Sequence, residues 1–137
     1  MSKKQDLYHS YYNPYMVGTD RSIPDEMAVI GAGNIGPDIA YYLRTGAPDK
    51  KLYLVDVAEE PLKKAEQRFK SYAQKGLDRK KMTPEEAERI LGNIVYTTDY
   101  SQLKNCDLVI EAATENLSLK RKIFALLEEI VDEKCVL

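Results

Sequence analysis

Three glycines stand between an apolar run and an amphipathic run in AVIGAGNIGPDIAYYL, residues 28–43. The stretch MAVIGAG predicts a short buried strand that ends in glycine. The residues after it predict a helix, with Ile35, Ile39 and Leu43 on one face and Gly46 at its end. The sequence therefore predicts a strand that turns within a few residues into a helix.

The same alternation continues along the chain. KLYLVDV, NIVYTTD and CDLVIEA are further predicted strands, and the final CVL has the composition of a fifth. Predicted helices separate them: one opened by acids and Pro61, one that begins at Thr83 with the capping box TPEE, and one in ENLSLKRKIFALLEEIV. This alternation predicts an α/β fold, a Rossmann-type doubly wound parallel sheet covered on both faces and truncated at its fifth strand.

The three glycines match the pattern G-x-G-x-x-G in the context that its function requires, after a strand and at the start of a helix. The first permits a tight turn, the second lets the backbone approach a pyrophosphate, and the third lets helix and strand pack closely. The helix N-terminus adds free N–H groups. The predicted dinucleotide-binding turn consists of Gly31, Ala32, Gly33, Asn34, Ile35 and Gly36. A tight turn without a ligand is the alternative.

Asp56 ends the strand LYLVD twenty residues after Gly36. This is the position of the acid that binds the ribose hydroxyls of the adenosine. The next residues are VAEE, without a nearby cation. Two unit charges about 4 Å apart repel by roughly 4 kcal/mol at an effective dielectric of 20, so we expect NAD rather than NADP. An aspartate that only caps the next helix is the alternative.

Charged residues near two helix starts need an explanation. Asp38 suits the helix dipole but would repel a pyrophosphate, so we expect its carboxylate to face away, while Pro37 costs little in a first turn. Lys120, Arg121 and Lys122 oppose the dipole of their helix, which suggests that at least one is held for a ligand. A solvated charged face is the alternative for these cations.

VIGAGNIG, LYLVD and VIEAATENLSLKRKIF resemble, in order and spacing, the N-terminal domain of the L-3-hydroxyacyl-CoA dehydrogenase family. The likeness covers residues 27–137, and its last motif separates this family from most other Rossmann dehydrogenases. Ile35 stands where the family usually has Met, and Asp38 where it usually has a small residue. The resemblance implies an NAD enzyme of fatty-acid β-oxidation type, which oxidises a 3-hydroxyacyl-CoA to a 3-ketoacyl-CoA.

The resemblance also implies roles for single residues. The turn over residues 31–36 would bind the pyrophosphate and Asp56 the adenine-side ribose. The other implied cofactor contacts are Ala112, Ala113, Glu115 near the nicotinamide, and Lys120. The family's basic segment after the second strand helps to hold the CoA, and here an exposed basic face is the alternative. That segment contains Lys63, Lys64, Arg68, Lys70, Lys75, Arg79, Lys80 and Lys81.

The family's catalytic residues would lie beyond Leu137, with the helical domain that makes its dimer. The only histidine, His9, lies in a Tyr-rich N-terminal extension over residues 1–26. This extension is expected to be a partly ordered arm or to pack on a second domain or subunit. We expect an NAD-binding portion over 27–137, from a fragment or a truncated gene product, with no catalytic residue and no activity alone. A non-catalytic NAD-sensing module and a different NAD-dependent dehydrogenase are the alternatives.

The composition gives no sign of binding to nucleic acid, membranes or metals. The net charge of −2 gives no general attraction to nucleic acid or membranes, and no apolar run is long enough to span a bilayer. Cys106 and Cys135 form no CxxC pair or Cys/His cluster, so no metal is expected. Two free thiols predict a cytoplasmic location.

Overall fold

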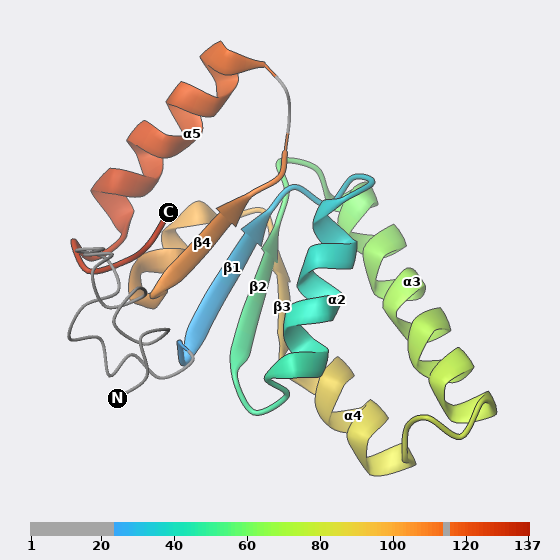
Figure 1. Ribbon diagram of the computed structural model, residues 1–137. Coiled ribbons are helices and arrows are strands. Elements are labelled where there is room, and N and C mark those ends of the chain that lie inside the picture. Colours follow the sequence, from blue (N-terminus) through green and yellow to red (C-terminus); the bar gives the residue numbers. More distant parts are fainter. Residues whose placement is uncertain (1–23, 114–115) are drawn as a thin grey trace, which may run out of the picture.

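The protein forms a parallel four-stranded sheet (Figure 1). The computed structural model describes residues 24–113 and 116–137. The strands are β1 (Glu26–Ile30), β2 (Lys51–Val55), β3 (Ile94–Thr97) and β4 (Leu108–Glu111), in the order β3-β2-β1-β4. All three strand pairs are parallel. The predicted α/β fold of Rossmann type is therefore confirmed, and Glu115 and most of the predicted extension lie outside the described residues.

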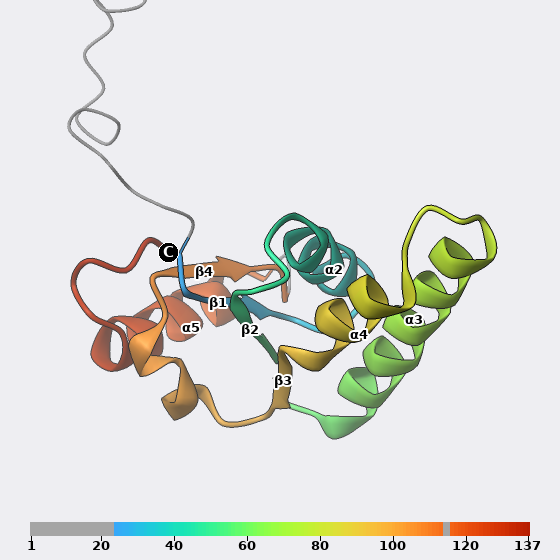
Figure 2. The ribbon, with the colours of Figure 1, turned by 90° about the horizontal axis from the view of Figure 1, so that it is seen from below.

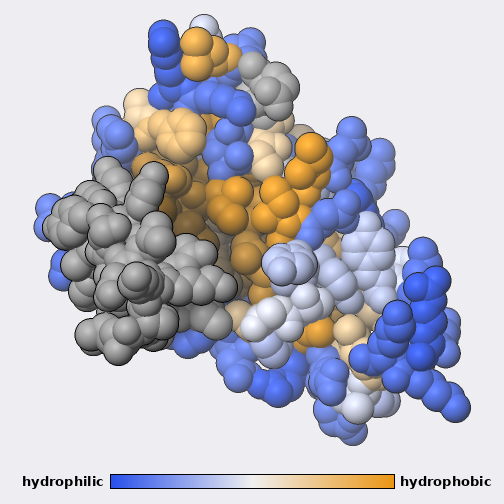
Figure 3. Space-filling view, in the orientation of Figure 1, coloured by the Kyte–Doolittle hydropathy of each residue, from blue (hydrophilic) through white to orange (hydrophobic). Residues whose placement is uncertain are grey.

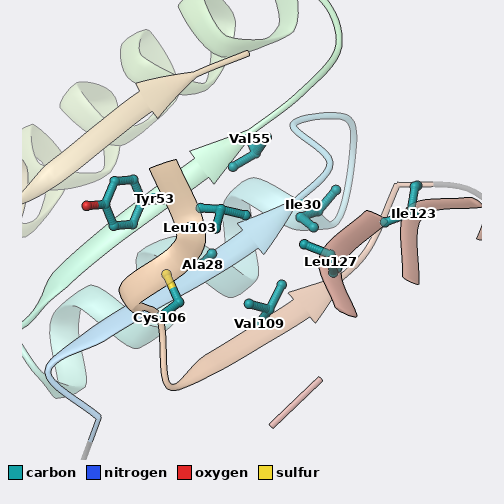
Figure 4. Packing of buried hydrophobic residues seen from close by; sticks show 9 residues of the cluster. All are labelled: Ala28, Ile30, Tyr53, Val55, Leu103, Cys106, Val109, Ile123 and Leu127. Carbon is teal, nitrogen blue, oxygen red and sulfur yellow. The ribbon is translucent and has the colours of Figure 1, made fainter. Parts of the chain in front are cut away.

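Helices cover both faces of this sheet (Figure 2). The helices are α2 (Gly36–Gly46), α3 (Glu59–Asp78), α4 (Pro84–Gly92), α5 (Leu117–Ile130) and the short 3-10 helix η1 (Tyr100–Asn105). Alternate residues of β1 point to opposite layers: Val29 packs with α2 and α3, whereas Ala28 and Ile30 pack with α5 and η1. Figure 4 shows the layer that α5 and η1 cover, in which Ile123 and Leu127 of α5 lie over the sheet.

Local sequence signals set most helix ends. Thr83 caps α4 by accepting a hydrogen bond from the N–H of Glu86 at 3.2 Å, as the capping box predicts. Asn116 caps α5 in the same way, and α2 ends at Gly46. One expectation was wrong: Ile35 is 66% exposed, because it precedes the first residue of α2 and cannot join the buried helical face. The helix η1 was not predicted.

The predicted fifth strand is present as a single parallel bridge between Leu108 and Val136. The N–H of Val109 donates to the carbonyl of Val136 at 2.8 Å, and the N–H of Val136 donates to the carbonyl of Asp107 at 2.9 Å. The residues around Val136 therefore extend the sheet beside β4.

A buried arginine joins the far ends of α2 and α4. Arg44 is fully buried, and no carboxylate within the described residues forms an ion pair with it. Its guanidinium donates instead to backbone carbonyls, those of Ile90 at 2.9 Å, Pro48 at 2.8 Å and Ala47 at 3.2 Å, and those of Lys50 and Arg89. These bonds connect the segments that lead into β2 and β3, at the end of the sheet away from the glycine-rich turn.

Candidate functional site

The glycine-rich turn lies at the carboxyl end of β1, and its first glycine is required by the fold. Gly31 has a φ of +107°, which L side chains rarely adopt. A Cβ there would lie 2.6 Å from the Cα of Ala113 and 2.7 Å from the carbonyl oxygen of Ala112. Gly31 therefore allows the turn to pass directly against the end of β4, and it brings the predicted residues Ala112 and Ala113 to this turn.

The other two glycines of the motif differ in what surrounds them. A Cβ at Gly36 would lie 1.7 Å from the carbonyl oxygen of Gly31, so the start of α2 packs directly on the turn. A Cβ at Gly33 would meet no heavy atom of the described residues within 4 Å. The protein's own packing thus requires glycine at 36 but not at 33, and the open space at Gly33 fits a group that approaches from outside, such as a pyrophosphate.

Gly33 and the two residues after it carry backbone donors. Gly33, Asn34 and Ile35 are exposed, and their N–H groups take part in none of the hydrogen bonds within residues 24–113 and 116–137. Among the described side chains, none caps α2 at its N-cap residue, Ile35. Free N–H groups and the positive end of a helix dipole are an anion-binding arrangement.

Asp56, at the end of β2, is tied to the same turn. One carboxylate oxygen accepts a hydrogen bond from the N–H of Ala32 at 2.9 Å, and the other accepts from the N–H of Ala58 at 3.0 Å. Each carboxylate oxygen can accept a further bond. The motif spacing identified Asp56, but it did not reveal that this carboxylate also holds the turn.

A cavity of about 150 Å³ opens beside Asp56. It lies where β1, β2 and β4 end, on the side of the sheet that α5 covers. Its lining residues are Ile30, Gly31, Asp56, Val57, Tyr100, Ala113, Leu119 and Ile123. Burial, and then the charges of Asp56 and Glu111, raise the pKa of the Tyr100 hydroxyl, so this side chain is a neutral wall of the cavity. The structure therefore places an apolar recess next to the predicted ribose-binding acid.

Lys120 has a partner within the chain. Its ammonium nitrogen lies 3.4 Å from a carboxylate oxygen of Glu111, whose side chain is only 4% exposed. The other oxygen of Glu111 accepts a hydrogen bond from the N–H of Ala113 at 2.7 Å. This buried acid at the end of β4 offsets a cation in the first turns of α5, and sequence reasoning missed it because only the fold brings it under the helix.

Asp38, the acid in the first turn of α2, is held by α3. Its carboxylate oxygens lie 2.7 Å from a terminal nitrogen of Arg68 and 2.7 Å from the hydroxyl of Tyr72, which donates to it. The negative charge at the start of α2 is therefore compensated by a cation of α3.

The basic segment proposed for CoA is mostly solvent-facing. Figure 3 shows hydrophilic side chains over α3. Lys70 lies 3.6 Å from Glu66 on the same helix face. A cavity of about 640 Å³ between α3 and α4 has Lys80 and Lys81 in its wall. No contact within the described residues assigns one of these cations to CoA, so that role stays a prediction.

Comparisons with known proteins support the same interpretation. Residues 26–137 match the family model described as 3-hydroxyacyl-CoA dehydrogenase, NAD binding domain. The 3-hydroxyadipyl-CoA dehydrogenase of Escherichia coli is 35% identical over 111 residues, which are 81% of this chain and 23% of that protein. The glyoxysomal fatty acid β-oxidation multifunctional protein MFP-a of Brassica napus is 33% identical over 123 residues, 87% of this chain and 17% of that protein.

Solved structures agree with the fold. The 3-hydroxybutyryl-CoA dehydrogenase of Escherichia coli superimposes with a TM-score of 0.78 at 33% identity, over 82% of this chain and 24% of that chain. The (S)-3-hydroxybutyryl-CoA dehydrogenase of Ralstonia eutropha gives a TM-score of 0.75 at 30% identity, over 82% of this chain and 39% of that chain. The chain spans less than a quarter of the length of the curated relatives it matches.

Proposed function

Since this chain belongs to the 3-hydroxyacyl-CoA dehydrogenase family, as its NAD-binding domain, we propose that it supplies the cofactor-binding half of a site that oxidises a 3-hydroxyacyl-CoA to a 3-ketoacyl-CoA. The observation that carries the proposal is the open space at Gly33, where no heavy atom of residues 24–113 and 116–137 lies within 4 Å of the position that a Cβ would take. A glycine that internal packing does not require, beside free N–H groups, fits a bound phosphate.

Each element of the site has a role in this proposal. The turn over residues 31–36 binds the pyrophosphate through its N–H groups. Asp56 accepts hydrogen bonds from the ribose hydroxyls on the lone pairs that Ala32 and Ala58 leave free. The cavity beside Tyr100 receives the adenine ring. Ala112, Ala113 and Lys120 contact the cofactor, and Glu115, which lies outside the described residues, is assigned to it by the family motif. The pair of Lys120 and Glu111 links the end of β4 to α5.

Bound NAD supplies the acceptor for a hydride from the substrate carbon. The substrate hydroxyl must lose its proton at the same time, and a positioned base contributes about 10²–10⁴-fold to such a step. No histidine occurs within the described residues. We therefore propose that the base and the second wall of the substrate site come from residues outside 27–137, and that this chain alone binds NAD without oxidising substrate.

Partners and location belong to the same proposal. The relatives include a fatty acid oxidation complex subunit alpha and a peroxisomal multifunctional protein. For the protein that contains this domain we propose 3-hydroxyacyl-CoA as substrate, a homodimer made through a further domain, and a cytoplasmic location. Within the described residues, no helix is long and apolar enough to cross a bilayer.

The direct test is calorimetric titration of this chain with NAD and NADP, followed by an assay for NADH absorbance with 3-hydroxybutyryl-CoA. We expect NAD to bind more tightly than NADP and no NADH to form. Absence of NAD binding, or equal affinity for both cofactors, would contradict the proposed site. Turnover by the purified chain would contradict the proposed origin of the base.

A further inference from the structure

Arg68 of α3 reaches across to the glycine-rich turn and binds its backbone. One terminal nitrogen donates to the carbonyl oxygen of Asn34 at 3.1 Å, and the other to that of Gly33 at 3.5 Å. The first nitrogen also lies 2.7 Å from a carboxylate oxygen of Asp38. The Nε of Arg68 donates to the hydroxyl of Tyr72 at 2.7 Å, and that hydroxyl donates to Asp38 at 2.7 Å. One guanidinium therefore connects the turn, α2 and α3.

These contacts fix the direction of the turn's free donors. In a trans peptide the C=O and the following N–H point in opposite directions, and the described chain has no cis peptide. Because the carbonyls of Gly33 and Asn34 are held toward Arg68, the N–H groups of Asn34 and Ile35 point away from α3. Within the turn, Gly33, Asn34 and Ile35 are the exposed residues whose N–H groups no acceptor among the described residues uses, so these are two of those three groups.

The same side chain also controls the charge beside the turn. Asp38 lies in the first turn of α2, and a carboxylate there opposes the binding of a phosphate to the adjacent N–H groups. Arg68 compensates that charge while its own side chain remains one-third exposed, at 33%. Without Arg68, Asp38 would keep only the Tyr72 hydroxyl among the described partners of its side chain.

We propose that Arg68 is a positioning residue for the cofactor pyrophosphate: it orients the N–H groups of Asn34 and Ile35, and it neutralises Asp38. This inference rests on the proposed function, since it concerns the same site. It implies that Arg68 affects ligands that carry a diphosphate and has little effect on the adenosine part, which lies toward Asp56 and the neighbouring cavity.

The test compares Arg68→Gln with the wild type in titrations with NAD, ADP and adenosine. Loss of charge-assisted hydrogen bonds should weaken NAD and ADP binding about tenfold or more and leave adenosine binding within about twofold. The double variant Asp38→Asn/Arg68→Gln should regain part of that loss, because the uncompensated charge is gone. Arg89→Gln is the matched control, since Arg89 lies on α4 and its guanidinium pairs with Asp49 among the described ion pairs.

Arg68→Lys gives a second measure that does not depend on the glutamine variant folding. It keeps the charge beside Asp38 but loses the planar fork, so its affinity for ADP should lie between those of wild type and Arg68→Gln. In ¹H–¹⁵N spectra without ligand, the amide signals of Asn34 and Ile35 should shift in both variants.

Three results would overturn the inference: unchanged ADP affinity in Arg68→Gln, an equal loss for adenosine and ADP, or no recovery in the double variant. A wild-type chain that binds neither NAD nor ADP would instead refute the proposed function itself, and the inference with it. Wild-type binding is therefore measured first.

Discussion

Substitution of Gly33 by alanine should separate what the fold needs from what a ligand needs. In the part of the chain that the structure describes, no heavy atom lies within 4 Å of the added Cβ, and Gly33 is not among the residues with positive φ. The change therefore adds no clash and no backbone strain. Because alanine reduces the conformational freedom of the unfolded chain, the free energy of unfolding should stay the same or rise by about 0.4–1 kcal/mol.

Although Gly33→Ala should not lower the stability of the fold, it should lower the affinity for NAD. A phosphate oxygen must come within about 2.9 Å of a backbone nitrogen to accept its hydrogen bond. The added methyl group occupies the space through which the phosphate approaches. Loss of one such charge-assisted bond costs about 1.5–3 kcal/mol, and each 1.4 kcal/mol is about tenfold in affinity. We expect NAD to bind about ten- to a hundredfold more weakly.

Gly46→Ala is the matched control for this experiment. A Cβ at Gly46 also meets no described heavy atom within 4 Å, but Gly46 lies at the other end of α2. Urea unfolding should give similar stabilities for the two variants, and calorimetry should show weaker NAD binding for Gly33→Ala alone. Equal NAD affinity in the two variants would refute the argument that the space at Gly33 belongs to the cofactor.

The remaining predictions concern the acid, the buried arginine and a buried thiol. Asp56→Asn should raise the ratio of NADP to NAD affinity about tenfold or more, since it removes the charge facing a 2′-phosphate; an unchanged ratio in parallel titrations would exclude that role. Arg44→Met should lower the free energy of unfolding by about 3 kcal/mol or more, because several buried carbonyls lose a donor worth about 1–3 kcal/mol each; urea unfolding measures this, and a loss near zero would contradict it. Burial raises the pKa of the Cys106 thiol from 9.0 to about 12. Above pH 9.0 the thiol ionises in the unfolded chain but not in the folded one, so the stability linked to this group is complete below pH 9.0 and is lost as the pH rises toward 12. The free energy of unfolding of Cys106→Ala should therefore fall less steeply over that pH range than that of the wild type.

The sequence predicted those parts of the protein whose signals are local. The apolar run that ends in Gly31 predicts a strand followed by a turn. The four residues of the capping box TPEE predict a helix start at Thr83, which is the N-cap of α4. The spacing from Gly36 to Asp56 predicted an acid close to the turn, and Asp56 lies there because the turn and the acid follow neighbouring parallel strands.

The contacts that complete the site could not be predicted in the same way. Arg68 is 30 residues from Asp38, and only the packing of α3 on α2 brings the two side chains together. The partner of Lys120 is Glu111, at the end of a strand that precedes the helix, and nothing in the sequence pattern marks it as buried. The helix η1 shows no helical periodicity; a side-chain bond from the N–H of Ser101 to Asp99 starts it, and such bonds are also common in loops.

The double engagement of Asp56 limits how the coenzyme preference could be engineered. Replacing this acid, the obvious first step toward NADP, also takes away an acceptor from the N–H of Ala32 or Ala58. Val57 offers another route, because this residue is 82% exposed and lines the same cavity. An arginine at that position would add a positive charge for a 2′-phosphate while the carboxylate goes on holding the turn. Redesign should therefore begin beside the acid and leave the acid in place.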